Sequence, residues 1–356
     1  MKRKKALIAM SGGVDSSVAA LLLTKKGYEC IGCTMKLYNN EDIGISSRTC
    51  CSLKDFNDAG SVASKLGMKY YVLNFSSDFK NKVIDKFVQC YERAQTPNPC
   101  IDCNKYMKFE KLYNMAQNLD CDCIVTGHYA RIEKSGDKYY LKKAVDETKD
   151  QSYVLYSLTQ DTLAHTLFPL GELHKNEIRK IAKENNFINA DKPDSQDICF
   201  VPDGNYVKAI ERFSNKEIKP GKFIDTDAKV IGRHKGIVHY TIGQRRGLGS
   251  FQKHVYVCKI SAEDNTVMLG NLEDLLKREF FVTDFNWTLG EPPAKKFKCS
   301  VKTRYRQQEK PAEVLAEGNN NVKIIFDEPQ KAITPGQAAV LYDGDIVLGG
   351  GTIISI

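Results

Sequence analysis

The sequence predicts an α/β fold in which an N-terminal doubly wound parallel sheet is followed by two small β-rich domains, the last a β-barrel. Short apolar segments alternate with amphipathic helical patterns in the first half, whereas glycine and proline turns separate short β-rich runs in the second half. The length of 356 residues suits two or three domains of about 150 residues each. We expect the domains to cover residues 1–205, 206–275 and 276–356.

The first half repeats a strand-then-helix pattern. Residues 5–10 form a short apolar run, and Val14, Val18, Leu21 and Leu22 then recur at the spacing of one helical face. Repeated units of this kind favour a parallel sheet that is covered by helices on both faces. Further strands are predicted at 28–35, 70–75 and 123–126, and further helices at about 56–66, 79–91 and 105–118.

The pattern changes after about residue 205. Turns such as 219–221 and 262–265 separate β-rich runs at 255–260, 266–269 and 322–326. Short strands between frequent turns are typical of small antiparallel sheets and barrels.

Composition excludes several classes of protein. Hydrophobic residues at 42% and charged residues at 27% are typical of a globular chain. No apolar run approaches the ~20 residues of a membrane span. The apolar stretch at 6–10 is also shorter than the ~7–15 residues of a secretory signal. We therefore expect a cytoplasmic protein with no membrane partner.

Charge and cysteine content suggest partners and chemistry. The formal net charge of +8 permits a polyanionic partner without requiring one. Twelve cysteines are too few for a disulfide scaffold of this length, so in a reducing compartment they are thiols, metal ligands or sulfur-handling groups.

A loop of small residues, Ser-Gly-Gly-Val-Asp-Ser-Ser at 11–17, separates the first strand from the first helix. Such a loop lets backbone N–H groups approach an anion, and the helix N-terminus adds partial positive charge. Asp15 is placed either to hold Mg²⁺ or to cap the helix. The whole string predicts a phosphate-binding site.

Two polar segments carry cysteines that stand out from the others. Cys100 and Cys103 lie in a proline-stiffened loop that runs into a helix, and Cys199 lies in a second polar segment. A helix N-terminus and Lys105 would stabilise a thiolate at Cys103. Two such thiols would deliver sulfur together: one would carry a persulfide sulfur, and the other would resolve it by disulfide exchange. The role of the pair Cys50-Cys51 is open, and structural thiols are expected at Cys90, Cys121, Cys123, Cys258 and Cys299.

Cations at alternate positions between 296 and 306 predict a β-strand with one basic face. A basic face of this kind can neutralise RNA phosphates. An ordinary solvated face of a sheet explains the same pattern, and both interpretations stay open. The cations are Lys296, Lys298, Lys302, Arg304 and Arg306.

Several segments together resemble the tRNA-specific 2-thiouridylases, which belong to the PP-loop ATP pyrophosphatase superfamily with its Rossmann-like sheet. The Ser-Gly-Gly-x-Asp-Ser loop is that of the superfamily, and it differs from a Walker A loop, which has Gly-Lys-Ser/Thr. The resemblance covers essentially the full chain. The segments are Ser11–Ser17, Thr96–Lys105, Thr126–Ala130, Lys149–Ser152, Asp194–Phe200, Tyr240–Gln244 and Thr334–Ala338.

The resemblance implies a sulfurtransferase that thiolates carbon 2 of the wobble uridine in the anticodon loop of tRNA. ATP with Mg²⁺ would adenylate the uridine oxygen, and a cysteine persulfide would then displace AMP. A sulfur-donor protein, such as a cysteine desulfurase or a sulfur relay protein, is implied as a partner. A wobble base must leave the anticodon stack to reach such a site.

Carried over position by position, Cys199 resembles the persulfide carrier and Cys103 its nucleophilic partner. The ATP contacts that the resemblance implies are Ala9, Met10, Ser11, Gly12, Gly13, Val14, Asp15, Ser16, Met35 and Gly127. The tRNA contacts that it implies are His128, Lys149, Asp150, Gln151, Arg304, Tyr305 and Gln337.

The chain departs from some relatives at Cys100, where they carry an aspartate that is proposed to assist proton transfer; Asp102 occupies a different position. Cys100, Cys103 and Cys199 are therefore candidate ligands of a [4Fe–4S] cluster with one open iron. The alternative is that Cys100 is an extra redox thiol.

Two other functions compete with tRNA thiolation. A PP-loop ligase or amidotransferase acting on a small metabolite would use the same loop, although nothing in the sequence resembles a glutaminase domain. A non-catalytic RNA-binding iron–sulfur protein would bind RNA without releasing pyrophosphate.

Overall fold

The computed structural model describes residues 3–39, 41, 43, 53–194, 197–249, 251, 254–318 and 320–355. The pair Cys50-Cys51 and the dipeptide at 195–196, inside the segment Asp194–Phe200, lie outside these described residues.

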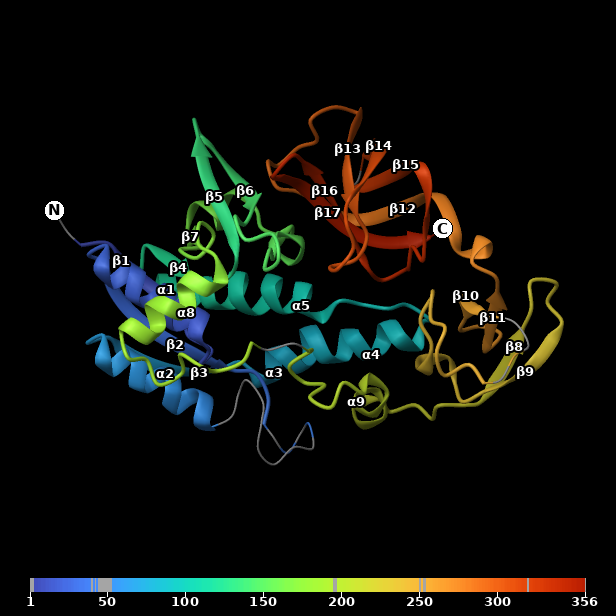
Figure 1. The fold of residues 1–356 in the computed structure, drawn as a ribbon, viewed down its shortest axis with the longest axis horizontal. Coiled ribbons are helices and arrows are strands. Elements are labelled where there is room, and N and C mark those ends of the chain that lie inside the picture. Colours follow the sequence, from blue (N-terminus) through green and yellow to red (C-terminus); the bar gives the residue numbers. More distant parts are fainter. Residues whose placement is uncertain are drawn as a thin grey trace.

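The first domain is built on a five-stranded parallel sheet with the order β3-β2-β1-β4-β7 (Figure 1). The chain adds β2 and β3 on one side of β1 and then β4 on the other, so the winding direction reverses between β1 and β4. Ligands of open parallel sheets bind at the carboxyl ends of the strands at such a reversal. The strands are β1 (Lys5–Ala9), β2 (Glu29–Lys36), β3 (Lys69–Asn74), β4 (Cys123–Val125) and β7 (Thr166–Leu167).

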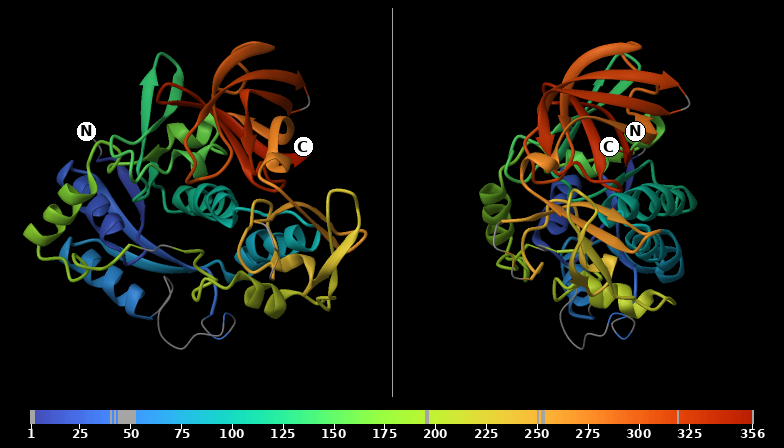
Figure 2. Two further views of the ribbon diagram at one scale, coloured as in Figure 1. Left: turned by 45° about the vertical axis from the view of Figure 1, so that its right-hand side comes forward. Right: turned by 90° about the vertical axis from the view of Figure 1, so that its right-hand side faces the viewer.

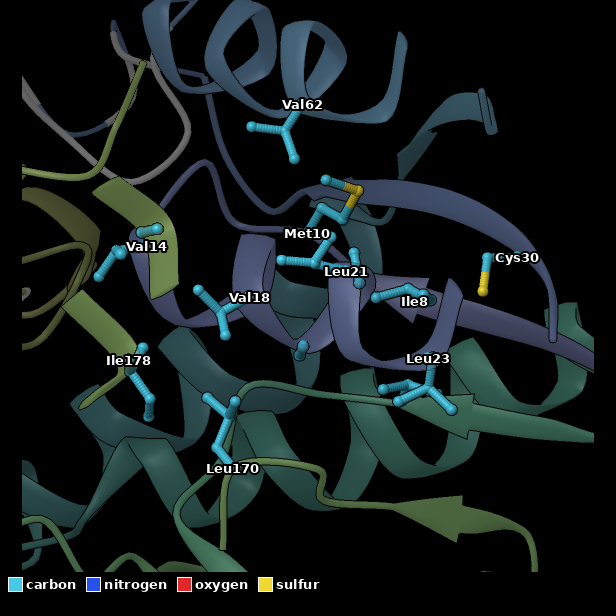
Figure 3. Close-up of a cluster of buried hydrophobic side chains, with 14 of the residues drawn as sticks. Ile8, Met10, Val14, Val18, Leu21, Leu23, Cys30, Val62, Leu170 and Ile178 are labelled. Carbon is cyan, nitrogen blue, oxygen red and sulfur yellow. The ribbon is translucent and has the colours of Figure 1, made fainter. Parts of the chain in front are cut away.

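Helices cover both faces of this sheet, as predicted. On one face, α1 (Val14–Lys25), α2 (Leu53–Lys65) and α8 (Lys175–Glu184) bury Val18, Val62 and Ile178 with Ile8 of β1. Figure 3 shows these side chains converging from separate elements. The opposite face packs Leu7, Leu112 and Ala116 together with side chains of the C-terminal barrel.

Two long helices, predicted as single elements, contain π-helical turns. The helix expected at 79–91 comprises α3 (Ser76–Phe79), η1 (Lys80–Ile84) and α4 (Asp85–Glu92). The helix expected at 105–118 begins earlier and comprises α5 (Pro99–Asp102), η2 (Cys103–Lys111) and α6 (Leu112–Asn118). Other helical segments are η3 (Ser152–Leu155), α7 (Gln160–Ala164), α9 (Tyr206–Phe213), η4 (Ile237–His239) and η5 (Glu273–Leu275).

The middle domain is a small mixed sheet with the order β10-β11-β8-β9. It encloses its own core around Phe223, Val257 and Leu269. The β8–β11 pair is parallel, which differs from the expected antiparallel arrangement. Its strands are β8 (Gly221–Ile224), β9 (Val230–His234), β10 (Tyr256–Ser261) and β11 (Thr266–Gly270).

The C-terminal domain is a closed antiparallel barrel, because β12 pairs with both β15 and β17. A hairpin of the first domain, β5 (Ala130–Ser135) and β6 (Lys138–Lys143), extends the same sheet where Lys142 pairs with Ile346. Figure 2 shows this hairpin beside the barrel. The barrel strands are β12 (Leu276–Trp287), β13 (Lys296–Lys302), β14 (Lys310–Gly318), β15 (Asn321–Lys331), β16 (Ala338–Asp343) and β17 (Ile346–Ser355).

The predicted basic strand face is wrong beyond Lys302, where β13 ends. A turn follows, and Arg304 points inward to hydrogen-bond the carbonyl oxygen of Ile242 at 2.9 Å. Lys296 and Lys298 lie near carboxylates of β14 and β15, at 2.9 Å from Glu313 and 3.7 Å from Asp327. Alternation in the sequence does not reveal where a strand turns, so it overstated the length of the basic face.

Within the described residues, no helix is both long enough and apolar enough to span a membrane.

Candidate active site

The loop of small residues lies between β1 and the N-terminus of α1, at the carboxyl edge of the sheet. The backbone N–H of Ser11 donates to Ser16 Oγ at 3.1 Å, and the hydroxyl groups of Ser16 and Ser17 donate to the carbonyl oxygen of Gly13. These bonds fold the loop over the first turn of α1. Because the first amides of a helix lack helical acceptors, the loop is built to receive an anion.

Two glycines allow this loop to pack tightly. Gly12 has a φ of +73°, and a Cβ on it would lie 2.4 Å from the carbonyl oxygen of Asp55. Gly127 follows β4, and a Cβ there would lie 2.9 Å from the backbone nitrogen of Ser16. Both contacts are with backbone atoms, so only glycine fits at either position.

Asp15 is held by the protein itself. Its carboxylate accepts hydrogen bonds from Tyr129 Oη at 2.7 Å and from Lys175 Nζ at 2.7 Å. Lys175 also pairs with Asp194 at 2.7 Å, and Lys149 pairs with Asp194 at 2.9 Å. Burial raises the pKa of Asp194, but the ammonium groups of Lys175 and Lys149 outweigh it and hold that pKa below its usual value. Asp15 is thus paired with Lys175 and Tyr129 at the wall of both cavities, and its role toward Mg²⁺ stays a prediction.

The other side of the loop is anchored by residues that the sequence analysis missed. Lys192 Nζ donates to the carbonyl oxygen of Gly12 at 3.0 Å and pairs with Asp55 and Asp58. The side-chain amide of Asn189 donates to the same carbonyl oxygen at 3.0 Å. These residues lie more than a hundred positions from the loop, and their polar segment carries no motif that would have revealed them.

Cys100 and Cys103 lie on the helix that starts at Pro99 and continues through α5, η2 and α6, which we call the cysteine helix. The side chain of Asn98 accepts a hydrogen bond from the backbone N–H of Cys100 at 3.1 Å, which caps this helix. Cys100 is exposed and in the first turn, whereas Cys103 is half-buried and begins the π-helical segment. The helix therefore starts before Cys103, so its N-terminal dipole favours a thiolate at Cys100 more than the sequence suggested.

Cys199 lies in the loop between α8 and α9, where neighbouring residues fix its position. Tyr38 Oη donates to the carbonyl oxygen of Cys199 at 2.9 Å. The adjacent Phe200 is buried, and its ring meets the rings of Phe79 and Phe87 edge-to-face. The half-buried Cys199 side chain is thereby held beside the cysteine helix.

A single cavity of about 380 Å³ joins these elements. Its wall contains residues of the loop, the carboxyl ends of β2 and β4, the cysteine helix and the turn of Cys199. The residues expected to bind ATP or to carry sulfur that line it are Ala9, Met10, Ser11, Asp15, Ser16, Met35, Cys100, Cys103, Gly127 and Cys199. An anion-binding loop and three thiols therefore face one space.

His128 is buried in the wall of the same cavity. Its Nδ1 lies 2.7 Å from Thr126 Oγ1, and its Nε2 lies 3.2 Å from Lys108 Nζ. Burial, together with the charge of Lys108, lowers the pKa of His128 well below its usual value. The imidazole is therefore neutral at physiological pH.

A larger cleft of about 1100 Å³ extends from the loop to the barrel. Its walls combine the first domain with the turn that follows β13. Of the expected tRNA contacts, Lys149, Asp150, Gln151 and Tyr305 line it. Lys302 and Arg306 also line it, so part of the basic segment does face this space.

Arg304 and Gln337 line neither cavity. The guanidinium of Arg304 donates to the carbonyl oxygen of Ile242 and to Thr334 Oγ1 at 2.6 Å. The amide of Gln337 donates to the carbonyl oxygen of Thr96 at 2.7 Å. In this structure both side chains join domains to one another, and their role as tRNA contacts stays a prediction.

The thiols differ in their surroundings. Burial raises the pKa of Cys90, Cys123 and Cys299, as expected for structural cysteines. Burial likewise raises the pKa of Cys121 to about 11 and raises that of Cys258.

In the described part of the chain, no three or more His, Cys, Asp or Glu side chains are grouped as a metal site requires. The assignment of Cys100, Cys103 and Cys199 as ligands of a [4Fe–4S] cluster therefore stays a prediction.

Three models of known protein families match successive parts of this chain. Models described as a tRNA methyl transferase HUP domain, a tRNA methyl transferase PRC-barrel domain and an aminomethyltransferase beta-barrel domain match residues 4–203, 208–271 and 277–353. The tRNA-specific 2-thiouridylase MnmA of Clostridioides difficile (strain 630) is 50% identical over 98% of this chain and 98% of the relative. This chain belongs to the tRNA-specific 2-thiouridylase family.

Other relatives agree over the same length. The tRNA-specific 2-thiouridylase MnmA of Carboxydothermus hydrogenoformans is 48% identical over 99% of this chain and 98% of the relative. That of Acetivibrio thermocellus is 47% identical over 99% of this chain and 100% of the relative. Membership of the tRNA-specific 2-thiouridylase family confirms the resemblance and the fold class predicted from the sequence.

Proposed function

We propose that this chain is a sulfurtransferase that thiolates carbon 2 of the wobble uridine of tRNA at the expense of ATP. One observation carries the proposal: the anion-binding loop, Cys103 and Cys199 line the same cavity. Activation by a nucleotide and delivery of sulfur must act on one carbonyl group, so the two functions have to share a space.

In the first step, O2 of the uridine attacks the α-phosphorus of ATP. The bond from that phosphorus to the bridging oxygen breaks, pyrophosphate leaves with the electron pair, and the N3 proton is released. The loop around Ser11 and Ser16 and the N-terminus of α1 hold the phosphates. When bound with the nucleotide at this loop, Mg²⁺ would supply positive charge that offsets the negative charge of the departing pyrophosphate.

In the second step, the terminal sulfur of a persulfide on Cys199 attacks carbon 2. The bond from carbon 2 to oxygen breaks, and AMP leaves. The thiolate of Cys103 then attacks the Sγ atom of Cys199, which forms a disulfide and leaves both electrons of the broken S–S bond on the sulfur of the base. Protonation at N3 gives 2-thiouridine, and a thiol reductant restores the two cysteines.

We propose that the anticodon loop lies in the larger cleft, with its backbone along Lys149, Tyr305 and Arg306. The wobble base would leave the stack and enter the smaller cavity, because the two spaces adjoin along Ser11, Asp15 and Gln151, which line both. The persulfide on Cys199 is supplied by a sulfur-donor protein.

The test combines ATP, Mg²⁺, tRNA and a persulfide donor, followed by digestion of the tRNA to nucleosides. We expect one AMP for each 2-thiouridine. Cys199→Ser and Cys103→Ser should abolish multiple turnover, and the matched variant Cys258→Ser, altered in the middle domain, should not. A small carboxylate or amide that stimulates AMP formation in place of tRNA would favour the metabolite ligase instead.

The disulfide and cluster mechanisms differ in metal content. The disulfide mechanism predicts that the anaerobically purified protein holds no stoichiometric iron or acid-labile sulfide. It also predicts that Cys100→Ala keeps thiolation with a persulfide donor. Stoichiometric iron that is absent from Cys100→Ala would assign the three thiols to a cluster instead.

A further inference from the structure

Among the described residues that line the smaller cavity, Lys108 is the one cationic side chain. The other basic residue there, His128, is neutral. It lies on η2, five residues after Cys103. In an α-helix a residue five positions later points about 140° away around the axis. In a π-helix, hydrogen bonds run from i to i+5, so five residues complete slightly more than one turn. The π-helical segment thus brings Lys108 to the same wall as Cys103.

The partner of Lys108 is a neutral ring. An ammonium group only donates hydrogen bonds, so Nε2 of His128, at 3.2 Å from Lys108 Nζ, must accept. The ring proton is therefore on Nδ1 and is donated to Thr126 Oγ1 at 2.7 Å. Phe109 and Phe168 pack against the imidazole on two sides and fix its plane.

This environment differs from that of the other lysines near the loop. Lys175, Lys192 and Lys149 all pair with carboxylates. In the described part of the chain, no carboxylate lies within ion-pair distance of Lys108. A neutral acceptor positions an ammonium group without cancelling its charge, so the charge of Lys108 is available to a ligand.

We propose that Lys108 is a catalytic residue that binds the α-phosphoryl group of the nucleotide, and that His128 is its positioning residue. The inference rests on the proposed function, because it assigns a step of that reaction. The ammonium group lines the same cavity as the loop and stabilises the negative charge that grows on the phosphoryl oxygens while uridine O2 attacks and pyrophosphate leaves. The same contact stabilises AMP as it leaves carbon 2.

The histidine then has a role different from the tRNA contact that the resemblance implies. Both of its ring nitrogens are engaged inside the protein, so neither offers a hydrogen to RNA. The effect of His128 on catalysis passes through the position of Lys108.

The experiment compares the full-length wild type with Lys108→Met and with Lys111→Met. Lys111 lies on the same helix, and its ion pair with Asp78 is exposed, so it is a matched control for removal of a charge. Methionine keeps the length of the lysine stem, so the half-buried Lys108→Met variant should fold. Two quantities are measured for each protein: kcat of tRNA-dependent pyrophosphate release and the dissociation constant of AMP.

We expect Lys108→Met to lower kcat by about 10²- to 10³-fold, as removal of a preorganised donor to a developing charge does. AMP affinity should fall by about tenfold, as removal of a charge-assisted hydrogen bond does. Lys111→Met should stay within about two-fold of wild type in both quantities. An unchanged kcat in Lys108→Met overturns the proposal, whether or not AMP binds more weakly.

The positioning role has its own test. His128→Gln keeps an oxygen that can accept from Lys108 and should retain most of the activity, whereas His128→Leu removes the acceptor and should lower kcat by up to as much as Lys108→Met does. The double variant Lys108→Met/His128→Leu should be no slower than Lys108→Met alone, since residues that act as a unit are not additive. Multiplying effects would show that His128 acts by itself and would overturn this role.

Failure of the inference is distinguishable from failure of the proposed function. A wild type that thiolates tRNA, beside a Lys108→Met variant of equal kcat, refutes the inference alone. A wild type that releases pyrophosphate but forms no 2-thiouridine refutes the proposed function, and the comparison of Lys108 variants in pyrophosphate release and AMP binding still holds.

Discussion

The side-chain amide of Gln337 in the barrel donates a hydrogen bond of 2.7 Å to the carbonyl oxygen of Thr96, in the loop that leads to the cysteine helix. The backbone N–H of Thr96 in turn donates to the carbonyl oxygen of Pro335 at 2.9 Å. A Cβ on Gly336 would lie 2.9 Å from the same nitrogen, so the two segments touch along their backbones. The barrel thus supports the loop that positions Cys100 and Cys103.

Gln337→Leu should therefore destabilise the protein before any RNA is added. The substitution leaves the carbonyl group of Thr96 without this donor, which costs about 1–3 kcal/mol. The measurement is the urea midpoint of the tRNA-free protein, with Gln330→Leu on the barrel surface as the control. An unchanged midpoint together with weaker tRNA binding would instead make Gln337 a direct tRNA contact.

Substitutions of Arg304 and Arg306 should have different effects, because we expect Arg304 to join domains and Arg306 to bind RNA. Arg306 is exposed at the cleft, so Arg306→Met should weaken tRNA binding and reduce the salt slope by about 0.7–0.9 for each phosphate that the variant no longer neutralises. Arg304→Met should lower thermal stability, because Arg304 holds Ile242 and Thr334. Equal salt slopes for the wild type and Arg306→Met would exclude Arg306 from phosphate binding.

Gly127→Ala should displace the phosphate loop. A Cβ on Gly127 would lie 2.9 Å from the backbone nitrogen of Ser16, and a backbone atom cannot move aside as a flexible side chain can. ATP affinity should fall by at least tenfold, and isothermal titration calorimetry measures it directly. Gly60→Ala is the matched control. Gly60 lies inside α2, and its Cβ would make an ordinary 3.5 Å contact with the ring of Tyr70, so the substitution should stabilise the helix by about 0.5–1 kcal/mol. Equal ATP affinities for Gly127→Ala and Gly60→Ala would refute the packing argument.

Regular patterns explain why much of the fold could be predicted from the sequence. The helical spacing of Val14, Val18 and Leu21 predicted α1, and the strand-helix alternation predicted a parallel sheet. The same spacing did not reveal the π-helical turns, because apolar residues such as Phe79, Val83 and Phe87 suit the buried face of either helix. Those turns are where local periodicity ceases to determine which side chain faces the cavity.

Contacts between distant segments account for what the sequence did not reveal. The pairing of Lys142 with Ile346 joins the first domain to the barrel across some 200 positions, and no local pattern encodes it. Lys192 and Asn189 reach the phosphate loop in the same way. Lys108 and His128 form a pair only because η2 and the end of β4 meet at the cavity. Motifs identified the chemistry, and tertiary packing determined which cations serve it.

Stability should fall as the pH is lowered, and His128 should account for part of this decrease. Its pKa in the folded protein is well below the unfolded value of about 6.5, so below that pH the unfolded chain binds one more proton at this site. Each pH unit below about 6.5 then costs up to about 1.4 kcal/mol until the folded-state pKa is reached. His128→Gln removes this proton, and urea midpoints measured between pH 5 and pH 7 should show a shallower slope. Identical slopes for wild type and His128→Gln would mean that the histidine is not held neutral.

Single-turnover transfer of sulfur tests most directly that one cavity unites nucleotide cleavage with a sulfur-bearing cysteine. The protein is loaded with a ³⁵S persulfide, freed of donor, and mixed with tRNA in the presence or absence of ATP. We expect label to pass from Cys199 to 2-thiouridine only with ATP, in equal amount to the AMP formed, leaving Cys103 and Cys199 oxidised. Transfer without ATP, or from a cysteine outside the cavity, would contradict this mechanism.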